Sequence, residues 1–370
     1  MGVPFGSGGD PHSYPKAPVQ GDAARGGGWQ HRGVKAYRCR VCGNPLYFEN
    51  SVCVSCGTSL GYSRDEAAIV PLDAEGRYVD GSGTPWWVCR NLALHGCTWL
   101  ARTRDGQCGA CDLTRTRPND ADAAGMARLP VAERAKRHLV AELDGLGFPV
   151  AGKDPHAGGD PENGLAFDLL SSGEQKVVIG HDGGVITIDL AEGDDAYRER
   201  MRSALDEPYR TMLGHFRHEV GHYYEWQLVE RGGPIARARE LFGDERADYQ
   251  AEIDRHYRDG PPDGWESTHL TAYATMHPYE DFAETWAHYL HICDTIQTAD
   301  EYGLATVAGV DAFSRFRDLV TGVWIPLSTA LNMINRSMGR DDLYPFVIPP
   351  AVLDKLDFVA SLRPGAEPAP

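Results

Sequence analysis

Eight of the nine cysteines in this 370-residue chain fall between positions 39 and 111, and their spacing constrains the fold more than any other feature. The first four form two C-x-x-C pairs that are ten residues apart: Cys39, Cys42, Cys53 and Cys56. Two such pairs let four thiolates converge on one ion, and Gly43 and Gly57 stand where tight knuckle turns need a positive φ. The spacing therefore predicts a structural zinc site.

A second group of four cysteines follows at a looser spacing: Cys89, Cys97, Cys108 and Cys111. Only its last two members form a C-x-x-C pair, but four thiols so close in sequence still predict a second four-cysteine zinc site. Four thiolates leave no open coordination position, so both zinc ions are expected to stabilise folding rather than to catalyse. The ninth cysteine, Cys293, is expected to be a buried apolar filler.

Charge is divided unevenly along the chain. Residues 1–118 hold 13 Lys and Arg against 10 Asp and Glu, whereas residues 119–370 hold 23 against 43. The acidic part would repel phosphate backbones, which makes nucleic acid an unfavoured ligand. The eleven arginines within 25–117 keep nucleic-acid binding by the cysteine-rich part as a minor alternative. No stretch approaches the roughly 18 apolar residues of a membrane span, and without an export signal we expect a cytoplasmic protein.

The sequence patterns predict an α+β protein with a mainly helical domain behind the cysteine-rich part. The stretch "KVVIGHDGGVITIDL" reads as a β-hairpin, so we expect a small antiparallel sheet there. The predicted organisation is a disordered extension, a zinc ribbon, a second four-cysteine module, a mainly helical domain and a disordered tail, at 1–36, 37–62, 63–118, 119–362 and 363–370.

The decapeptide "FRHEVGHYYE" (216–225) contains an H-E-x-x-H motif. A helix is predicted around it, beginning near Asp206 as N-cap and ending at Gly232–Pro234. On that helix His218 and His222 stand one turn apart on one face, so both imidazoles can bind one metal ion. Glu219 lies one residue round the helix, where it can act on a water molecule at the metal.

A catalytic zinc site needs a third protein ligand, and two acidic segments offer one. The first holds Glu240, Asp244, Glu245 and Asp248. The second holds Glu280 and Glu284, one helical turn apart, and it is favoured because Glu280 can bind the metal while Glu284 accepts a hydrogen bond from a ligating histidine. Three histidines are further candidates, although each is better explained as a surface or packing residue: His277, His288 and His291.

These motifs resemble those of known metallopeptidases. "HEVGH" followed by "Y-x6-E-D-F-A-E" is similar to the gluzincins, especially the type seen in anthrax lethal factor. The longer run over about 37–360 resembles a bacterial family of zinc-binding metallopeptidases that carry a zinc-ribbon front end. The resemblance implies that His218, His222 and Glu280 bind zinc, that Glu219 is the general base, and that Tyr273 stabilises an oxyanion. The 57 residues between His222 and Glu280 are a longer stretch than in the lethal-factor pattern.

The sequence thus predicts a zinc peptidase with one catalytic and two structural zinc ions, acting on a peptide or protein substrate. An extended substrate is expected to pair with residues 185–190 as an edge strand. The alternative is an adaptor in which the zinc ribbons bind a protein partner and the metallopeptidase-like domain is inactive.

Overall fold

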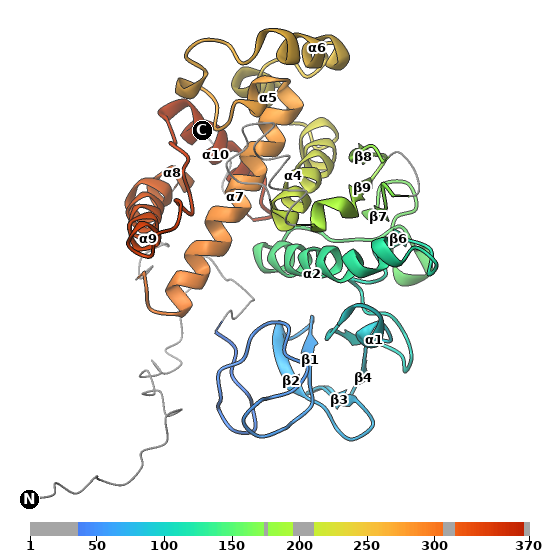
Figure 1. Cartoon of the computed structure of the whole chain (residues 1–370). Helices are drawn as coiled ribbons and strands as arrows, with labels where there is room; N and C mark the ends of the chain where they lie inside the picture. Colours follow the sequence, from blue (N-terminus) through green and yellow to red (C-terminus); the bar gives the residue numbers. More distant parts are fainter. Residues whose placement is uncertain (1–35, 174–176, 195–210, 306–314, 366–370) are drawn as a thin grey trace, which may run out of the picture.

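The computed structural model describes residues 36–173, 177–194, 211–305 and 315–365. The predicted α+β class is confirmed, since long helices combine with small sheets. Helix α2 (Ala123–Leu146) lies between the two parts of the chain, with the cysteine-rich region (36–118) on one side and most of the helical region (119–365) on the other (Figure 1). The extension and the tail that were predicted to be disordered fall mostly outside the described residues.

The cysteine-rich region contains two small antiparallel sheets. One is a hairpin and the other has the order β3-β4-β5; the strands are β1 (Leu60–Ser63), β2 (Ala68–Pro71), β3 (Arg77–Val79), β4 (Pro85–Val88) and β5 (Leu100–Ala101). The short helix α1 (Leu92–His95) precedes β5. The boundary predicted between residues 62 and 63 falls inside β1, so the structure has no break between the two cysteine modules at that point.

A small aromatic cluster joins the cysteine-rich region to the helical region. The ring centroids of Phe48 and Tyr62 lie 4.8 Å apart, as do those of Tyr62 and Trp99. This cluster is continuous with the apolar core of the helical region. Arg64 also donates from Nε to Oδ2 of Asp144 on α2 at 2.6 Å. The two regions therefore share one core, which compensates for the small apolar area that strands of two to four residues can bury.

The sheet of the helical region has four strands in the order β6-β7-β9-β8: β6 (Thr114–Thr116), β7 (Ala166–Leu170), β9 (Val185–Asp189) and β8 (Gly180–Asp182). The predicted hairpin is β8–β9, with Gly183 and Gly184 at positive φ in its turn. The sheet is mixed rather than antiparallel as predicted, because β6 and β9 both run parallel to β7. β6 comes from the end of the predicted second four-cysteine module, before the boundary expected at 118.

The position of β9 corrects a second expectation. Residues 185–189 pair with β7 on one side and with β8 on the other, so this strand lies inside the sheet and cannot pair with a substrate as an edge strand. The sequence pattern could not reveal this, because β-propensity does not specify which neighbours a strand acquires. β8 occupies the edge instead.

The helical region is dominated by α2, α4 and α7, accompanied by smaller helices. Its further helices are α4 (Met212–Tyr224), α5 (Ile235–Phe242), α6 (Tyr249–Asp259), α7 (Pro278–Glu301), α8 (Phe316–Leu319), α9 (Ile325–Ser337) and α10 (Pro350–Ser361). α4 packs directly against α7 (Figure 1). The contact is close because Gly221 faces α7: a Cβ atom there would lie 3.0 Å from the Cα of Ala283.

Candidate functional site

Helix α4 carries the H-E-x-x-H motif, as predicted. Its observed N-cap is Thr211, whose side chain accepts from the amide of Gly214; the predicted N-cap Asp206 lies outside the described residues. A π-helical turn (Glu225–Glu230) extends the helix up to the predicted stop. Phe216 and Val220 are fully buried, which fixes the rotation of α4 and turns the motif toward α7.

The structure brings three predicted zinc ligands together, although they come from helices far apart in sequence. Nε2 of His218 lies 3.0 Å from Oε2 of Glu280, and Nε2 of His222 lies 3.7 Å from the same oxygen. All three donor atoms lie within 4.8 Å of one another. Ligands about 2.0–2.1 Å from a tetrahedral zinc ion would be about 3.4 Å apart, so this donor set fits zinc. We call these three residues the helical site.

Glu284 orients the first histidine of the helical site. Its Oε1 lies 2.8 Å from Nδ1 of His218, and its Oε2 accepts from the hydroxyl of Thr271 at 2.9 Å. A carboxylate at Nδ1 places the imidazole proton there, which leaves the Nε2 lone pair free to bind a metal ion. The sequence prediction gave Glu284 this contact, but it did not foresee Thr271.

Glu280 is buried, with 3% of its surface exposed. Burial raises the pKa of its carboxyl, but His222 and His218 outweigh that effect and hold the pKa well below its usual range. A buried negative charge that faces two imidazole nitrogens is suited to a divalent cation.

Glu219 lies beside the helical site without belonging to it. The side chain is 8% exposed, and its Oε2 is buried with no hydrogen-bond partner among the described residues. Burial raises the pKa of its carboxyl. The charges of His218 and His222 lower that pKa and the charge of Glu280 raises it, so the carboxyl lies near all three residues. A buried carboxylate oxygen with no protein partner suits a group that acts on bound water.

Two tyrosines from outside α4 and α7 approach the helical site. The ring of Tyr273, in a short 3₁₀ turn (Tyr273–Thr275), lies 5.9 Å from the ring of His218 between centroids. Tyr249, the first residue of α6, donates from its hydroxyl to Oε1 of Glu280 at 2.7 Å. Sequence reasoning singled out Tyr273 and missed Tyr249. Its position, next to the acids 240–248, gave no signal of a contact with residue 280.

The competing acids lie outside the helical site, and each has another contact. Glu240 pairs with Arg237, and Asp244 pairs with Arg246. The remaining two, Glu245 and Asp248, bind Arg239 and cap helix α6, respectively.

The three spare histidines also have other contacts. His277 caps α7, with Nδ1 accepting from the amide of Tyr279, and its Nε2 donates to the carbonyl of Ala247. His288 contacts the hydroxyl of Tyr344, and His291 packs near the same ring. All three are packing residues, as expected.

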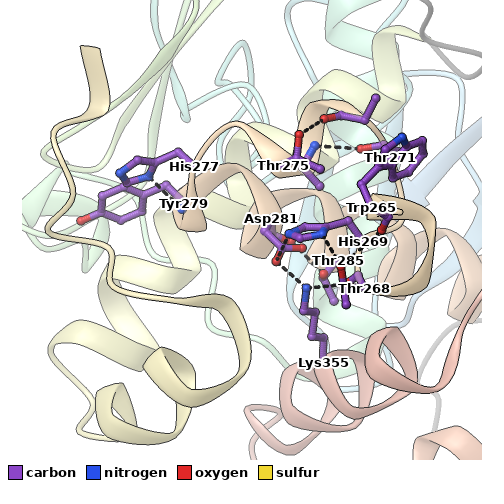
Figure 2. Close-up of polar contacts among 12 residues, drawn as sticks. Trp265, Thr268, His269, Thr271, Thr275, His277, Tyr279, Asp281, Thr285 and Lys355 are labelled. Atoms are coloured by element: carbon purple, nitrogen blue, oxygen red, sulfur yellow. Dashed lines mark hydrogen bonds and ion pairs between the residues drawn. The ribbon is translucent and has the colours of Figure 1, made fainter. Parts of the chain in front are cut away.

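A buried ion pair fixes the start of α7 next to Glu280 (Figure 2). Lys355 of α10 donates from Nζ to Oδ2 of Asp281 at 2.6 Å and to the carbonyl of Thr268 at 2.7 Å. His269 Nε2 lies 3.6 Å from the same carboxylate oxygen. Asp281 is 1% exposed and Lys355 is 4% exposed. One ammonium group thus joins α10, α7 and the loop that leads to Thr271.

Both predicted cysteine clusters assemble in the structure. The Sγ atoms of Cys39 and Cys56 lie 3.7 Å apart, and those of Cys42 and Cys53 lie 3.6 Å apart. In the second cluster the pairs Cys89–Cys111, Cys97–Cys108 and Cys97–Cys111 lie 3.7, 3.6 and 3.6 Å apart. Four sulfurs about 2.3 Å from one tetrahedral zinc ion would be about 3.8 Å apart, so both clusters fit zinc. We call them the first and second ribbon sites.

His95 supports the second ribbon site and was not predicted. Its Nδ1 lies 3.2 Å from a guanidinium nitrogen of Arg137 on α2, and its Nε2 lies 3.8 Å from Sγ of Cys111. Arginine can only donate, so Nδ1 accepts and the ring proton sits on Nε2, directed at the thiolate. Cys293 takes no part in any of the cysteine clusters and is 5% exposed, as expected of a filler.

This arrangement defines the class: a two-histidine, one-carboxylate centre on packed helices behind a four-cysteine zinc ribbon. The chain belongs to the family described as "Putative zinc-binding metallo-peptidase", whose model matches residues 126–362. A zinc-ribbon domain model matches residues 36–122.

The chain also resembles three proteins over nearly their whole length. Uncharacterized proteins of Mycobacterium bovis and Mycobacterium tuberculosis are 48% identical to it over 351 residues, which cover 91% of this chain and 98% of theirs. No solved structure matches it. Among the described residues, no helix has both the length and the apolar character that crossing a membrane requires.

Proposed function

We propose that this protein is a zinc-dependent peptidase of the gluzincin type, which hydrolyses peptide bonds in a peptide or protein substrate. One observation carries the proposal: three zinc-type donors converge beside a buried carboxylate oxygen, on Glu219, that has no partner in the described chain. A purely structural zinc site would have four protein ligands and no need of such a group.

The residues divide the work of hydrolysis among them. His218, His222 and Glu280 would hold the zinc ion, which would supply a Lewis acid that polarises the scissile carbonyl and lowers the pKa of water. Glu219 accepts a proton from the attacking water, whose oxygen bonds to the carbonyl carbon, and later delivers that proton to the amine nitrogen as the C–N bond breaks. The hydroxyl of Tyr273 donates a hydrogen bond to the oxyanion that forms in between.

The surrounding contacts support the reaction by keeping the ligands in place. Glu284 and Thr271 hold His218 with Nε2 toward the other donors, and Lys355 anchors the first turn of α7 through Asp281. Such outer contacts preserve geometry that a change of about 1 Å would spoil.

The decisive test removes the metal ligand and the base separately. His218→Ala is expected to lose one zinc ion per chain, whereas Glu219→Gln keeps the wild-type zinc content and loses at least about 100-fold in peptide hydrolysis. Zinc is measured by elemental analysis, and hydrolysis by mass spectrometry of a peptide library. His156→Ala, at an exposed position, and Glu240→Gln, at a rejected ligand position, are the matched controls and should behave as wild type.

Three outcomes would count against this proposal. Equal zinc content in wild type and His218→Ala would contradict the proposed metal centre. Hydrolysis that survives in Glu219→Gln would show that Glu219 is not the general base. A peptide library left uncut by zinc-loaded wild type would favour the adaptor alternative.

A further inference from the structure

Among the described residues, Tyr249 is the one group that contacts the third ligand from outside the two packed helices. Its hydroxyl donates to Oε1 of Glu280 at 2.7 Å, a normal length for an O–H···O hydrogen bond. The side chain is not buried: Tyr249 is 42% exposed. No described side chain of α6 is buried, so this contact is made by a helix at the surface.

The two carboxylate oxygens of Glu280 have different contacts. Oε2 faces Nε2 of both His218 and His222, while Oε1 is held by the phenol. A carboxylate can bind zinc through one oxygen or through both. With both oxygens on the ion, two histidines and Glu280 would fill four positions, and a bound water would make the ion five-coordinate. With Oε1 occupied by Tyr249, one position stays open for water.

Helix α6 is docked on the segment between Tyr273 and Glu280. A guanidinium nitrogen of Arg255 donates to the carbonyl of Thr275 at 3.2 Å, and the rings of Tyr249 and His277 meet edge to face at 5.1 Å. Both anchors lie on the stretch that leads from the proposed oxyanion donor to the third ligand. Docking of α6 is therefore linked to the geometry of the helical site.

We propose that Tyr249 is a positioning residue: it restricts Glu280 to one ligating oxygen, which makes the docking of α6 a condition for tight zinc binding and for an open fourth position. This inference rests on the proposed zinc peptidase function. Removing an outer hydrogen bond to a metal ligand typically lowers metal affinity by about 10- to 100-fold, and we expect a loss of that size here.

The test compares Tyr249→Phe with Tyr257→Phe in the full-length protein. Both variants remove one hydroxyl from α6, but Tyr257 is 66% exposed, and its ring packs beside His256 rather than at Glu280. A graded series of a zinc chelator first measures how readily the His218-dependent zinc ion leaves. Cobalt(II) is then added to the emptied site while the ribbons retain zinc, and visible absorption reports its number of ligands, because four-coordinate cobalt absorbs more strongly than five-coordinate cobalt.

We expect Tyr249→Phe to lose that ion at about 10- to 100-fold lower chelator activity and to give a weaker cobalt spectrum, with thermal unfolding unchanged. Tyr257→Phe should match wild type in every measurement. If both variants retain zinc and cobalt absorption as wild type does, the inference is overturned while the proposed function stands. If the wild-type protein has no His218-dependent zinc ion at all, the proposed function fails first, which is a separate result.

Discussion

The ribbon sites and the helical site are assembled in different ways. Each ribbon site draws four thiolates from a short stretch, 18 residues in the first and 23 in the second. The helical site draws its ligands from two helices, with 57 residues between His222 and Glu280. In the ribbons, local turns bring the donors together. In the helical region, the packing of α4 on α7 does so.

This difference predicts whether each site can lose its zinc ion without unfolding the surrounding part of the protein. A closed four-thiolate site holds together short strands that bury little apolar area, so loss of its metal is expected to unfold its module. A site with three protein ligands is built on a core that exists without it, because Phe216, Val220 and Trp286 are fully buried around it. The helical site should therefore lose its ion without loss of the fold, and it should be sensitive to the way the helices pack.

The largest effect is expected from Cys108→Ser, which removes a buried thiolate of the second ribbon site. Structural zinc supplies binding free energy on the order of 10–16 kcal/mol in small zinc domains, so the variant should lose one zinc ion and unfold its module. Elemental analysis and limited proteolysis measure the two losses. Cys293→Ser, at a buried cysteine outside both clusters, should keep its zinc. A Cys108→Ser protein with full zinc content and an intact ribbon would contradict the claim that the ribbon needs its zinc ion to fold.

A smaller effect is expected from Lys355→Met, which leaves the buried Asp281 carboxylate without its ammonium partner. Breaking such a pair typically costs about 3–5 kcal/mol in the free energy of unfolding. Chemical denaturation should show this loss, with weaker zinc binding at the helical site and unchanged ribbon zinc. The double variant Asp281→Asn/Lys355→Met removes the unpaired charge and should recover much of the stability. Equal stability of wild type and Lys355→Met would show that the ion pair between Lys355 and Asp281 does not stabilise the fold.

The smallest effect is expected from Gly221→Ala, because its new Cβ would lie 3.0 Å from the Cα of Ala283 and would push α4 away from α7. Such overpacking typically costs about 1–3 kcal/mol. Zinc affinity of the helical site should fall while both ribbons stay loaded. Gly145→Ala on α2 is the matched control, since nothing lies within 4 Å of a Cβ there. If both alanine variants bind zinc equally well, close packing at Gly221 does not set the geometry.

Much of the candidate site could be predicted because the spacing of nearby residues in the sequence determines which side chains lie together. Residues i and i+4 on a helix share a face, so His218 and His222 had to project together once the helix formed. C-x-x-C pairs likewise bring two thiolates together within one turn of chain. The third ligand was harder: Glu280 and the acids 240–248 were both available, and the structure brings only Glu280 to the two histidines. Its assignment as a ligand remains the proposal made above.

The sequence by itself determined the α+β class, the two four-cysteine clusters, the β8–β9 hairpin and the common face of the two motif histidines. Each of these depends on groups a few residues apart, whose relative positions follow from backbone geometry. Only the tertiary structure decided that β9 lies inside a mixed sheet, that β6 belongs to that sheet, and that Tyr249 and Lys355 flank the start of α7. These contacts join elements tens of residues apart, and no local periodicity records which of many apolar faces will pack together.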